Sequence, residues 1–227
     1  MTETVGQSDA ATVVATPAAT EPGRPARPGV PFLPAIFIAV ALLFLGGAVM
    51  YWWAEREDSP GAVDIGFYDD MSTHHLQAIR MANLYQQHGG DDDMLARAEE
   101  IAFFQSGDVR EMQNTLTEWG ETGTPDTAME WMGESYPQDA QPGMATPAEM
   151  EELAAARGAE LDDLFTRLMI DHHAGGLHMA GYAADEARVG DVRTFAGRIA
   201  RYQEREIDEL NHARQDLGLP VYEPRAN

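Results

Sequence analysis

The chain has 227 residues and a formal charge of −23, because 38 Asp and Glu residues oppose 15 basic residues, all of them Arg. Such a chain lacks the concentrated positive charge that binds phosphate backbones or anionic lipid head groups, so we expect no nucleic-acid partner. The absence of Cys excludes disulfides, thiolate nucleophiles, Cys-ligated zinc and iron–sulfur clusters. Methionine is plentiful, with 12 residues against 8 Phe, and supplies many thioether groups.

The beginning of the chain predicts a membrane anchor. Residues 1–29 are rich in Ala, Thr, Pro and Gly, and we expect them to form a disordered cytoplasmic tail. Residues 30–54 carry no charge, are long enough to cross a bilayer as a helix and end in three aromatic residues. Because two Arg residues precede this segment and acidic residues follow it, the positive-inside rule places residues 55–227 outside the plasma membrane, on a single-pass anchor. A cleaved signal peptide is the alternative.

The remainder of the chain contains an internal duplication. Residues of the same type recur at a constant offset of 98 positions, from Asp64 and Asp162 to Gly120 and Gly218, without a gap. A repeat this long that occurs only twice indicates a single pseudo-symmetric domain rather than a solenoid.

Each copy is predicted to form two helices. Gly89 and Gly90 separate the first two, and Thr146 with Glu149 forms a capping box that starts the third. We expect the four helices near residues 63–88, 92–119, 146–189 and 190–217. The long stretch over residues 120–146 is expected to be a crossover loop. The prediction is therefore an all-α protein, a four-helix bundle over residues 55–227 built from two duplicated hairpins and preceded by one transmembrane helix.

Polar side chains interrupt the apolar face of each predicted hairpin at one height. A helical wheel places Met and His side chains on the inward faces, and the antiparallel arrangement puts His75 level with Gln105 and His173 level with Gln203. The candidate metal-binding residues are Met71, His74, His75, Gln105, Asp108, Met112, Met169, His172, His173, Gln203 and Glu206.

The residue types at this height are typical of a copper site. Four buried imidazoles are costly unless partners are supplied. Met and His together are the ligands of soft or borderline cations, Cu(I) above all and then Cu(II) or Zn(II), so a copper ion is the predicted cofactor. The alternative is structural, with each His held by a Gln or Asp as a polar pin inside the core.

The motifs resemble the bacterial family known as domain of unknown function 305 (DUF305), over about residues 60–218. The matching motifs are Asp70-Met71 with His74-His75, Gln105-x-x-Asp108, Trp119-Gly120, Pro142-Gly143-Met144, Met169 with His172-His173, and Gln203-x-x-Glu206. The resemblance implies a ferritin-like fold, copper binding or copper tolerance outside the cytoplasm, and the Met and His residues as leading ligands. The copies differ, since Leu210 stands where the first copy has Met112, which implies unequal affinities or one vestigial copy.

Three functions follow from the sequence as hypotheses. The first is a membrane-anchored extracytoplasmic metal-binding protein that sequesters, delivers or confers tolerance to copper. The second is a ferritin-like two-metal oxidoreductase, disfavoured because Met replaces the carboxylate three residues before each His pair. The third is a structural module that docks to another envelope protein through its acidic surface.

Overall fold

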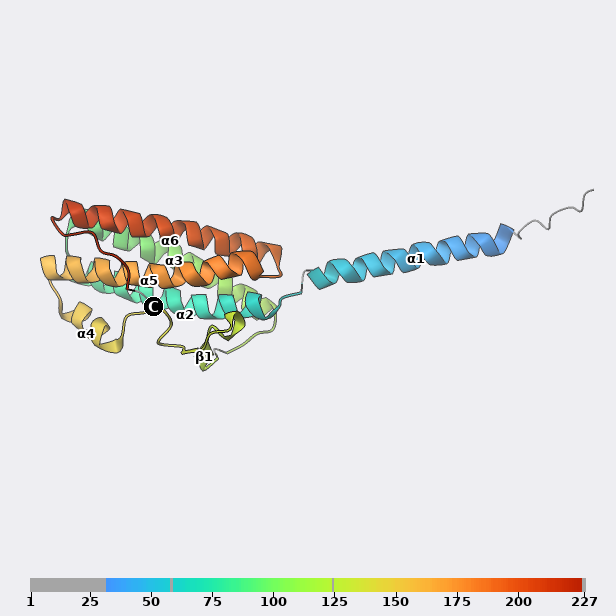
Figure 1. Ribbon diagram of the computed structural model, residues 1–227, viewed down its shortest axis with the longest axis horizontal. Helices are drawn as coiled ribbons and strands as arrows, with labels where there is room; N and C mark the ends of the chain where they lie inside the picture. The colour runs from blue at the N-terminus through green and yellow to red at the C-terminus, as the bar shows by residue number, and fades with distance from the viewer. Residues whose placement is uncertain (1–31, 58, 124, 226–227) are drawn as a thin grey trace, which may run out of the picture. The chain divides into compact units, whose positions relative to one another are not determined.

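The computed structural model describes residues 32–57, 59–123 and 125–225. In these ranges the chain is mostly helical, as predicted, with one two-stranded antiparallel hairpin (Figure 1). The elements are α1 (Phe32–Glu57), α2 (Ala62–His88), α3 (Asp92–Glu118), β1 (Thr127–Ala128), η1 (Glu130–Met132), β2 (Tyr136–Pro137), α4 (Pro147–Ala155), α5 (Ala159–Glu186) and α6 (Gly190–Asp216).

The predicted anchor falls partly on α1. The predicted tail over residues 1–29 and the first two residues of the predicted span, 30 and 31, lie outside the described residues. Among the residues that are described, no helix is both long enough and apolar enough to cross a membrane. The anchor therefore stays a prediction.

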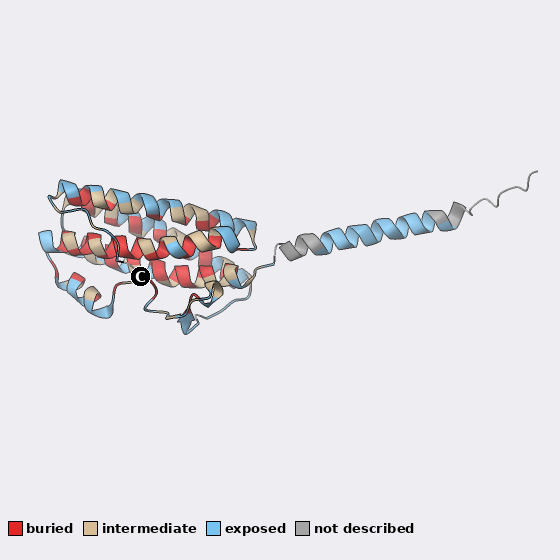
Figure 2. Cartoon of the chain, in the orientation of Figure 1, coloured by how far each residue is buried: buried red, intermediate tan, exposed pale blue. Residues whose placement is uncertain are grey.

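The four long helices α2, α3, α5 and α6 form two antiparallel hairpins. α2 packs against α3, α5 packs against α6, and α2 also packs along α5. Local capping fixes where the helices begin: the Asp91 carboxylate accepts the backbone N–H groups of Asp93 (3.0 Å) and Met94 (3.2 Å) at the start of α3. Figure 2 shows the buried residues concentrated on the sides of these helices that face one another.

The structure corrects the third predicted helix. We expected one helix from Thr146 to Val189, but it is divided into α4 and α5 between Ala155 and Ala159. Gly158 has a φ of 55°, which glycine adopts without a steric penalty, and this turn folds α4 back onto α2 and α5. The break keeps Leu153 of α4 buried in the bundle, whereas a straight helix would carry it past the end.

Each hairpin turn is held by an Asp from the other hairpin. Asp64 at the start of α2 accepts the backbone N–H groups of Arg188 (3.2 Å) and Val189 (2.8 Å) at the α5–α6 turn. Its repeat equivalent, Asp162 of α5, accepts the N–H of Asp91 (3.3 Å) at the α2–α3 turn. The two copies are thus locked together reciprocally.

The segments that leave the bundle are pinned by buried carboxylates. Asp70 of α2 accepts the Met129 backbone N–H (2.7 Å), the Trp131 indole N–H (2.6 Å) and the Gln138 amide (2.6 Å), which fixes the crossover against α2. Asp171 of α5 accepts the Tyr222 hydroxyl (3.0 Å) and so holds the C-terminal segment.

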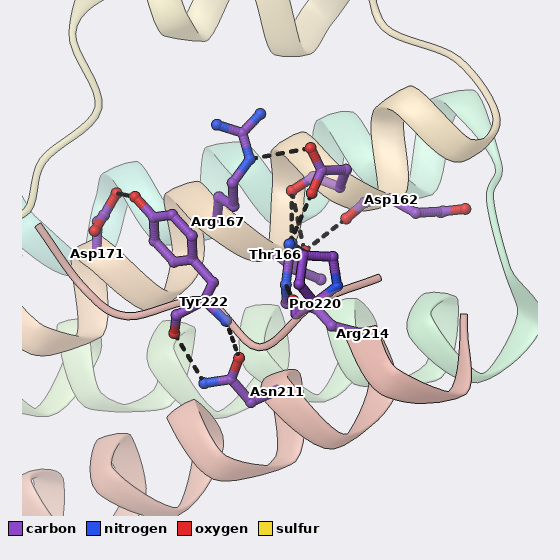
Figure 3. A network of polar contacts seen from close by, with 9 residues as sticks. Asp162, Thr166, Arg167, Asp171, Asn211, Arg214, Pro220 and Tyr222 are labelled. Atoms are coloured by element: carbon purple, nitrogen blue, oxygen red, sulfur yellow. Dashed lines mark hydrogen bonds and ion pairs between the residues drawn. The ribbon is translucent and has the colours of Figure 1, made fainter. Parts of the chain in front are cut away.

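The same C-terminal segment also depends on a buried arginine (Figure 3). Arg214 of α6 is 2% exposed and donates to the Thr166 hydroxyl (2.6 Å) and to the Pro220 carbonyl (2.9 Å), while its guanidinium pairs with Asp163 (2.9 Å). Asn211 and Tyr222 exchange two hydrogen bonds beside it. The charge of this arginine is therefore matched by oxygen acceptors, as a buried cation requires.

The apolar core is divided into two clusters. The first-turn cluster, which includes Met81, Tyr85 and Phe165, lies toward the α2–α3 turn. The second-turn cluster, which includes Phe67, Ala183 and Phe195, lies toward the α5–α6 turn. On every long helix, residues of one cluster are followed by polar side chains and then by residues of the other cluster. A polar layer therefore crosses the bundle at mid-height, between the two clusters.

Candidate metal centre

Six polar side chains make up the polar layer. All of them are 4% exposed or less, and every long helix contributes at least one: His74 and His75 from α2, Gln105 from α3, His172 and His173 from α5, and Gln203 from α6. Helical spacing and hairpin register placed the His and Gln residues of each hairpin at one height, and the structure brings both sets to the same part of the core.

The inner pair, His74 and His172, lies at the centre of the layer. Their rings have centroids 3.7 Å apart and an interplanar angle of 36°. The Nε2–H of His74 donates to the Pro142 carbonyl oxygen (3.2 Å), and that of His172 donates to the His74 carbonyl oxygen (2.9 Å). Because a carbonyl oxygen only accepts hydrogen bonds, each ring carries its proton on Nε2 and a lone pair on Nδ1.

Both inner rings are held neutral. Burial, followed by the neighbouring His75, lowers the pKa of His74 to about 3. Burial, followed by the adjacent His74, lowers the pKa of His172 well below its ordinary value. A neutral imidazole is the form that binds a metal ion, so the inner pair needs no deprotonation at neutral pH.

The outer pair, His75 and His173, faces carboxylates. The Nε2–H of His173 donates to Glu206 at 2.7 Å, whereas the same atom of His75 lies 3.8 Å from the Asp108 carboxylate, too far for a hydrogen bond. A carboxylate on one imidazole nitrogen orients the ring and leaves the other nitrogen free for a metal, as is common around protein-bound metals.

All four imidazoles leave Nδ1 buried and without a hydrogen-bond partner among the described residues. The Gln105 and Gln203 amides are likewise without partners at both of their polar atoms. The His–Gln pins of the structural alternative are thus not formed. Unpartnered buried polar atoms are rare and costly, and a cation bound in the layer would accept the lone pairs of the acceptors among them, above all His Nδ1.

The predicted thioether ligands flank the layer. Met71, Met112 and Met169 are each 0% exposed. Met71 and Met112 belong to the second-turn cluster and Met169 to the first-turn cluster, so sulfur is present on both sides of the layer. On their helices, Met71 and Met169 lie one turn before the His pairs.

The layer is not a complete metal centre of hard ligands. In the described part of the chain, no three His, Asp and Glu side chains are grouped closely enough to hold an ion by themselves. Thioether and imidazole groups together suit a soft cation such as Cu(I), whereas a hard cation prefers oxygen ligands. The donor set therefore fits copper better than a di-iron site of clustered carboxylates.

Sequence reasoning missed two contacts to the candidate site residues, one made by Pro142 and one made by Arg198. The Pro142 carbonyl reaches His74 from the crossover because Gly175 has no side chain there; a Cβ on Gly175 would lie 1.9 Å from the Pro142 oxygen. Arg198 of α6 pairs with Asp108 (3.2 Å). A signal for Arg198 existed in the repeat, since the equivalent position holds Glu100 with the opposite charge.

The fold and the layer define a duplicated helical bundle with a buried His and Gln centre. The family model for the domain of unknown function DUF305 matches residues 64–214, two thirds of the chain. The chain therefore belongs to the DUF305 family, and this confirms the resemblance seen in its motifs.

Several solved structures share the fold. A DUF305 protein from Streptomyces coelicolor is 31% identical with a TM-score of 0.66, over 71% of this chain and 97% of that one. A DUF305 fragment from Deinococcus radiodurans is 26% identical with a TM-score of 0.59, over 68% and 96%. CopM in its Cu(I)-bound form is 25% identical with a TM-score of 0.55, over 68% and 96%. A search of curated proteins finds no match.

Proposed function

We propose that this protein binds copper in the polar layer and that it sequesters, delivers or confers tolerance to the metal outside the cytoplasm. The observation that carries the proposal is the set of four buried Nδ1 atoms without partners, two of them on rings whose Nε2 proton and neutral state are fixed by the fold. These are lone pairs positioned for an electrophile, and nothing in the described protein fills that role.

The donor set indicates which residues would hold the ion. The Nδ1 atoms of the His residues supply nitrogen, no more than two of them to one ion as the side chains stand, and the sulfur atoms of Met71 and Met169 are the nearest soft donors along the same helices. In this arrangement Glu206 orients His173 through Nε2 rather than contacts the ion, and Asp108 faces Nε2 of His75 at a longer distance. The existence of CopM in Cu(I)-bound and Ag-bound forms, both with soft cations, supports the assignment.

The membrane anchor is part of the same proposal. The uncharged segment 30–54, with Arg residues before it and acids after it, supports a single span with the bundle outside the cytoplasm. Protease added to intact cells should digest the bundle and leave a tag at residue 1 protected. Digestion of the tag, with the bundle protected, would show that the chain has the opposite topology.

A copper titration of the full chain, in mild detergent, tests the central proposal. Cu(I) is added in competition with a chromophoric chelator. We expect the wild type to withdraw copper and a His74→Ala/His75→Ala/His172→Ala/His173→Ala variant to lose this ability. The matched control is His88→Ala/His178→Ala/His212→Ala, which removes imidazoles outside the polar layer and should bind as the wild type does.

Thermal unfolding separates metal binding from a purely structural role. A ligand at about 100 times its Kd stabilises the native state by about 2.7 kcal/mol if it binds only that state. Copper should therefore raise the Tm of the wild type and of the control variant but not that of the four-His variant. Equal melting of the wild type with and without copper would overturn the proposal in favour of the structural module.

A further inference from the structure

A groove of about 620 Å³ lies between α3 and α6. Its walls combine aromatic rings with charged groups from both helices: Phe103, Phe104, Asp108, Arg110, Glu111, Arg198, Tyr202 and Glu206. Phe103 is 75% exposed and Phe104 is 51% exposed, so large apolar side chains stand at the surface beside carboxylates. The groove is therefore unlike the ordinary charged exterior of this protein.

Two carboxylates connect the groove with the polar layer. Asp108 and Glu206 both line the groove, and their side chains are only 20% and 13% exposed. On their inner side they reach His75 (3.8 Å) and His173 (2.7 Å), which are themselves buried. A cation that exchanges water for these oxygens then lies beside the rings of His75 and His173, whose unpartnered nitrogen is Nδ1.

The aromatic walls strengthen the attraction of the groove for cations. The rings of Phe104 on α3 and Tyr202 on α6 lie nearly parallel, 14° apart, with centroids separated by 6.3 Å. Walls of low dielectric constant focus the field of the carboxylates along a cleft and raise the local concentration of counter-ions. The chain as a whole adds to this field with its net charge of −23.

Arg198 forms ion pairs with two carboxylates of the first copy, Asp108 and Glu111. Its Nη2 lies 3.2 Å from Asp108 and 3.3 Å from Glu111, and its guanidinium stacks 4.6 Å above the Phe195 ring. The duplication offers no equivalent lock on the second copy. The matching position is Glu100, which shares a small recess with Glu206; Arg97 lines the same recess but pairs with Glu209 (3.4 Å).

We propose that the α3–α6 groove is the path by which the metal cation reaches the polar layer, and that Arg198 restricts this path by holding Asp108. The inference rests on the proposed copper function and adds the route and its controlling residue. The cation is received on the Glu206 side, where no arginine of the described residues pairs with the carboxylate, and the Asp108 side opens when Arg198 leaves it.

A plug in the groove tests the path. Gly107 lines the groove, and a Cβ at this position would meet no atom within 4 Å, so Gly107→Phe starts from an open position and adds bulk to the groove. A plug slows binding and release of the ion by the same factor, because both use one path. We expect both rates to fall by at least about threefold with an unchanged Kd. Gly181→Phe, on α5 and equally open, is the matched control.

A charge deletion tests the restriction in the opposite direction. Arg198→Ala should accelerate Cu(I) binding by about threefold or more at low ionic strength, and the gain should shrink in ~0.5 M salt because screening weakens steering. Arg201→Ala is the matched control, because Arg201 is exposed on the same helix and does not line the groove.

The measurement is stopped-flow tryptophan fluorescence of the full chain in mild detergent, mixed anaerobically with Cu(I) as its acetonitrile complex. Release is followed after addition of excess chelator. Slower exchange in Gly107→Phe with faster binding in Arg198→Ala supports the path and its restriction. Wild-type rates in both variants, with copper still bound tightly by the wild type, overturn this inference and leave the proposed function standing. No copper binding by the wild type instead overturns the proposed function itself.

Discussion

The two hairpins carry the same His pair in different electrostatic surroundings. In the α5–α6 hairpin, His173 donates directly to Glu206 at 2.7 Å. In the α2–α3 hairpin, Asp108 stays 3.8 Å from His75 while its other oxygen binds Arg198 at 3.2 Å. The duplication has thus kept the imidazoles and changed what orients them. In the α5–α6 hairpin the carboxylate is hydrogen-bonded to the ring of His173. In the α2–α3 hairpin the carboxylate is paired with Arg198 instead of being hydrogen-bonded to His75.

The hairpins also differ in what they attach to the bundle, and this difference has the largest expected effect. Asp70 fixes the crossover to α2, but its repeat equivalent is the apolar Leu168. Asp70→Ala leaves the Met129 N–H and the Trp131 indole without their acceptor, and should lower the free energy of unfolding by about 2–5 kcal/mol. Urea unfolding measures this change.

The neighbouring Asp69 is the control for that experiment. Its Oδ2 is buried without a partner among the residues that the structure describes, and burial, followed by the charge of Asp70, raises the pKa of Asp69 to about 6. Asp69→Ala removes a poorly solvated charge and should leave stability unchanged or slightly higher at pH 7. Equal losses in the two variants would show that Asp70 has no special part in holding the crossover.

The second prediction compares the two carboxylates directly. Glu206→Gln replaces the charged acceptor that orients His173 with a neutral amide oxygen, and mutation of such a partner costs about 10–100-fold in metal affinity. Asp108→Asn, at the longer contact with His75, should cost less than about threefold by the same reasoning. Chelator competition with Cu(I) gives both values. A larger loss of affinity for Asp108→Asn would show that Asp108, and not Glu206, is the more important partner of the His residues.

The third prediction concerns the inner pair and pH. Below about pH 6.5 the unfolded chain protonates His74 and His172, whereas the folded chain keeps them neutral because their pKa values are lowered, that of His74 to about 3. The unfolded state then binds more protons, so the stability of the metal-free protein falls as the pH falls through this window. The slope reaches about 1.4 kcal/mol per pH unit for each group.

Urea midpoints at pH 7, 6 and 5 check the sign and the size of this effect. The His74→Gln/His172→Gln variant lacks both titrating groups and should show the shallower pH dependence. Other carboxylates titrate in both proteins, and the difference between the two curves isolates the inner pair. Parallel curves would contradict neutral, buried rings.

The smallest expected change in stability is at a position where one copy has glycine and the other does not. Gly107 of α3 corresponds to Arg205 of α6. Because a Cβ at Gly107 would meet nothing within 4 Å, Gly107→Ala should raise the free energy of unfolding by about 0.5–1 kcal/mol through lower backbone entropy in the unfolded chain. Gly176→Ala is the contrasting variant, because its Cβ would lie 2.4 Å from the Gln203 oxygen, and it should destabilise.

The sequence predicted the long helices and the polar layer because both depend on local or repeating signals. Helical spacing and a constant offset identified His74, Gln105 and their equivalents without knowledge of tertiary contacts. The break at Gly158 escaped prediction because it depends on α4 packing back onto the bundle. Contacts such as Pro142 with His74 join residues 68 positions apart and leave no local pattern.

The reciprocal hold of Asp64 and Asp162 on the opposite turns has a consequence for how such a protein can arise. Each hairpin completes its partner, so two separate copies of a single hairpin would assemble by the same contacts as a symmetric dimer, at a rate and yield set by their concentration. Joining them through residues 119–146 makes that association intramolecular. Covalent linkage frees each half from symmetry, so an arginine can hold the carboxylate beside one His pair and be absent beside the other.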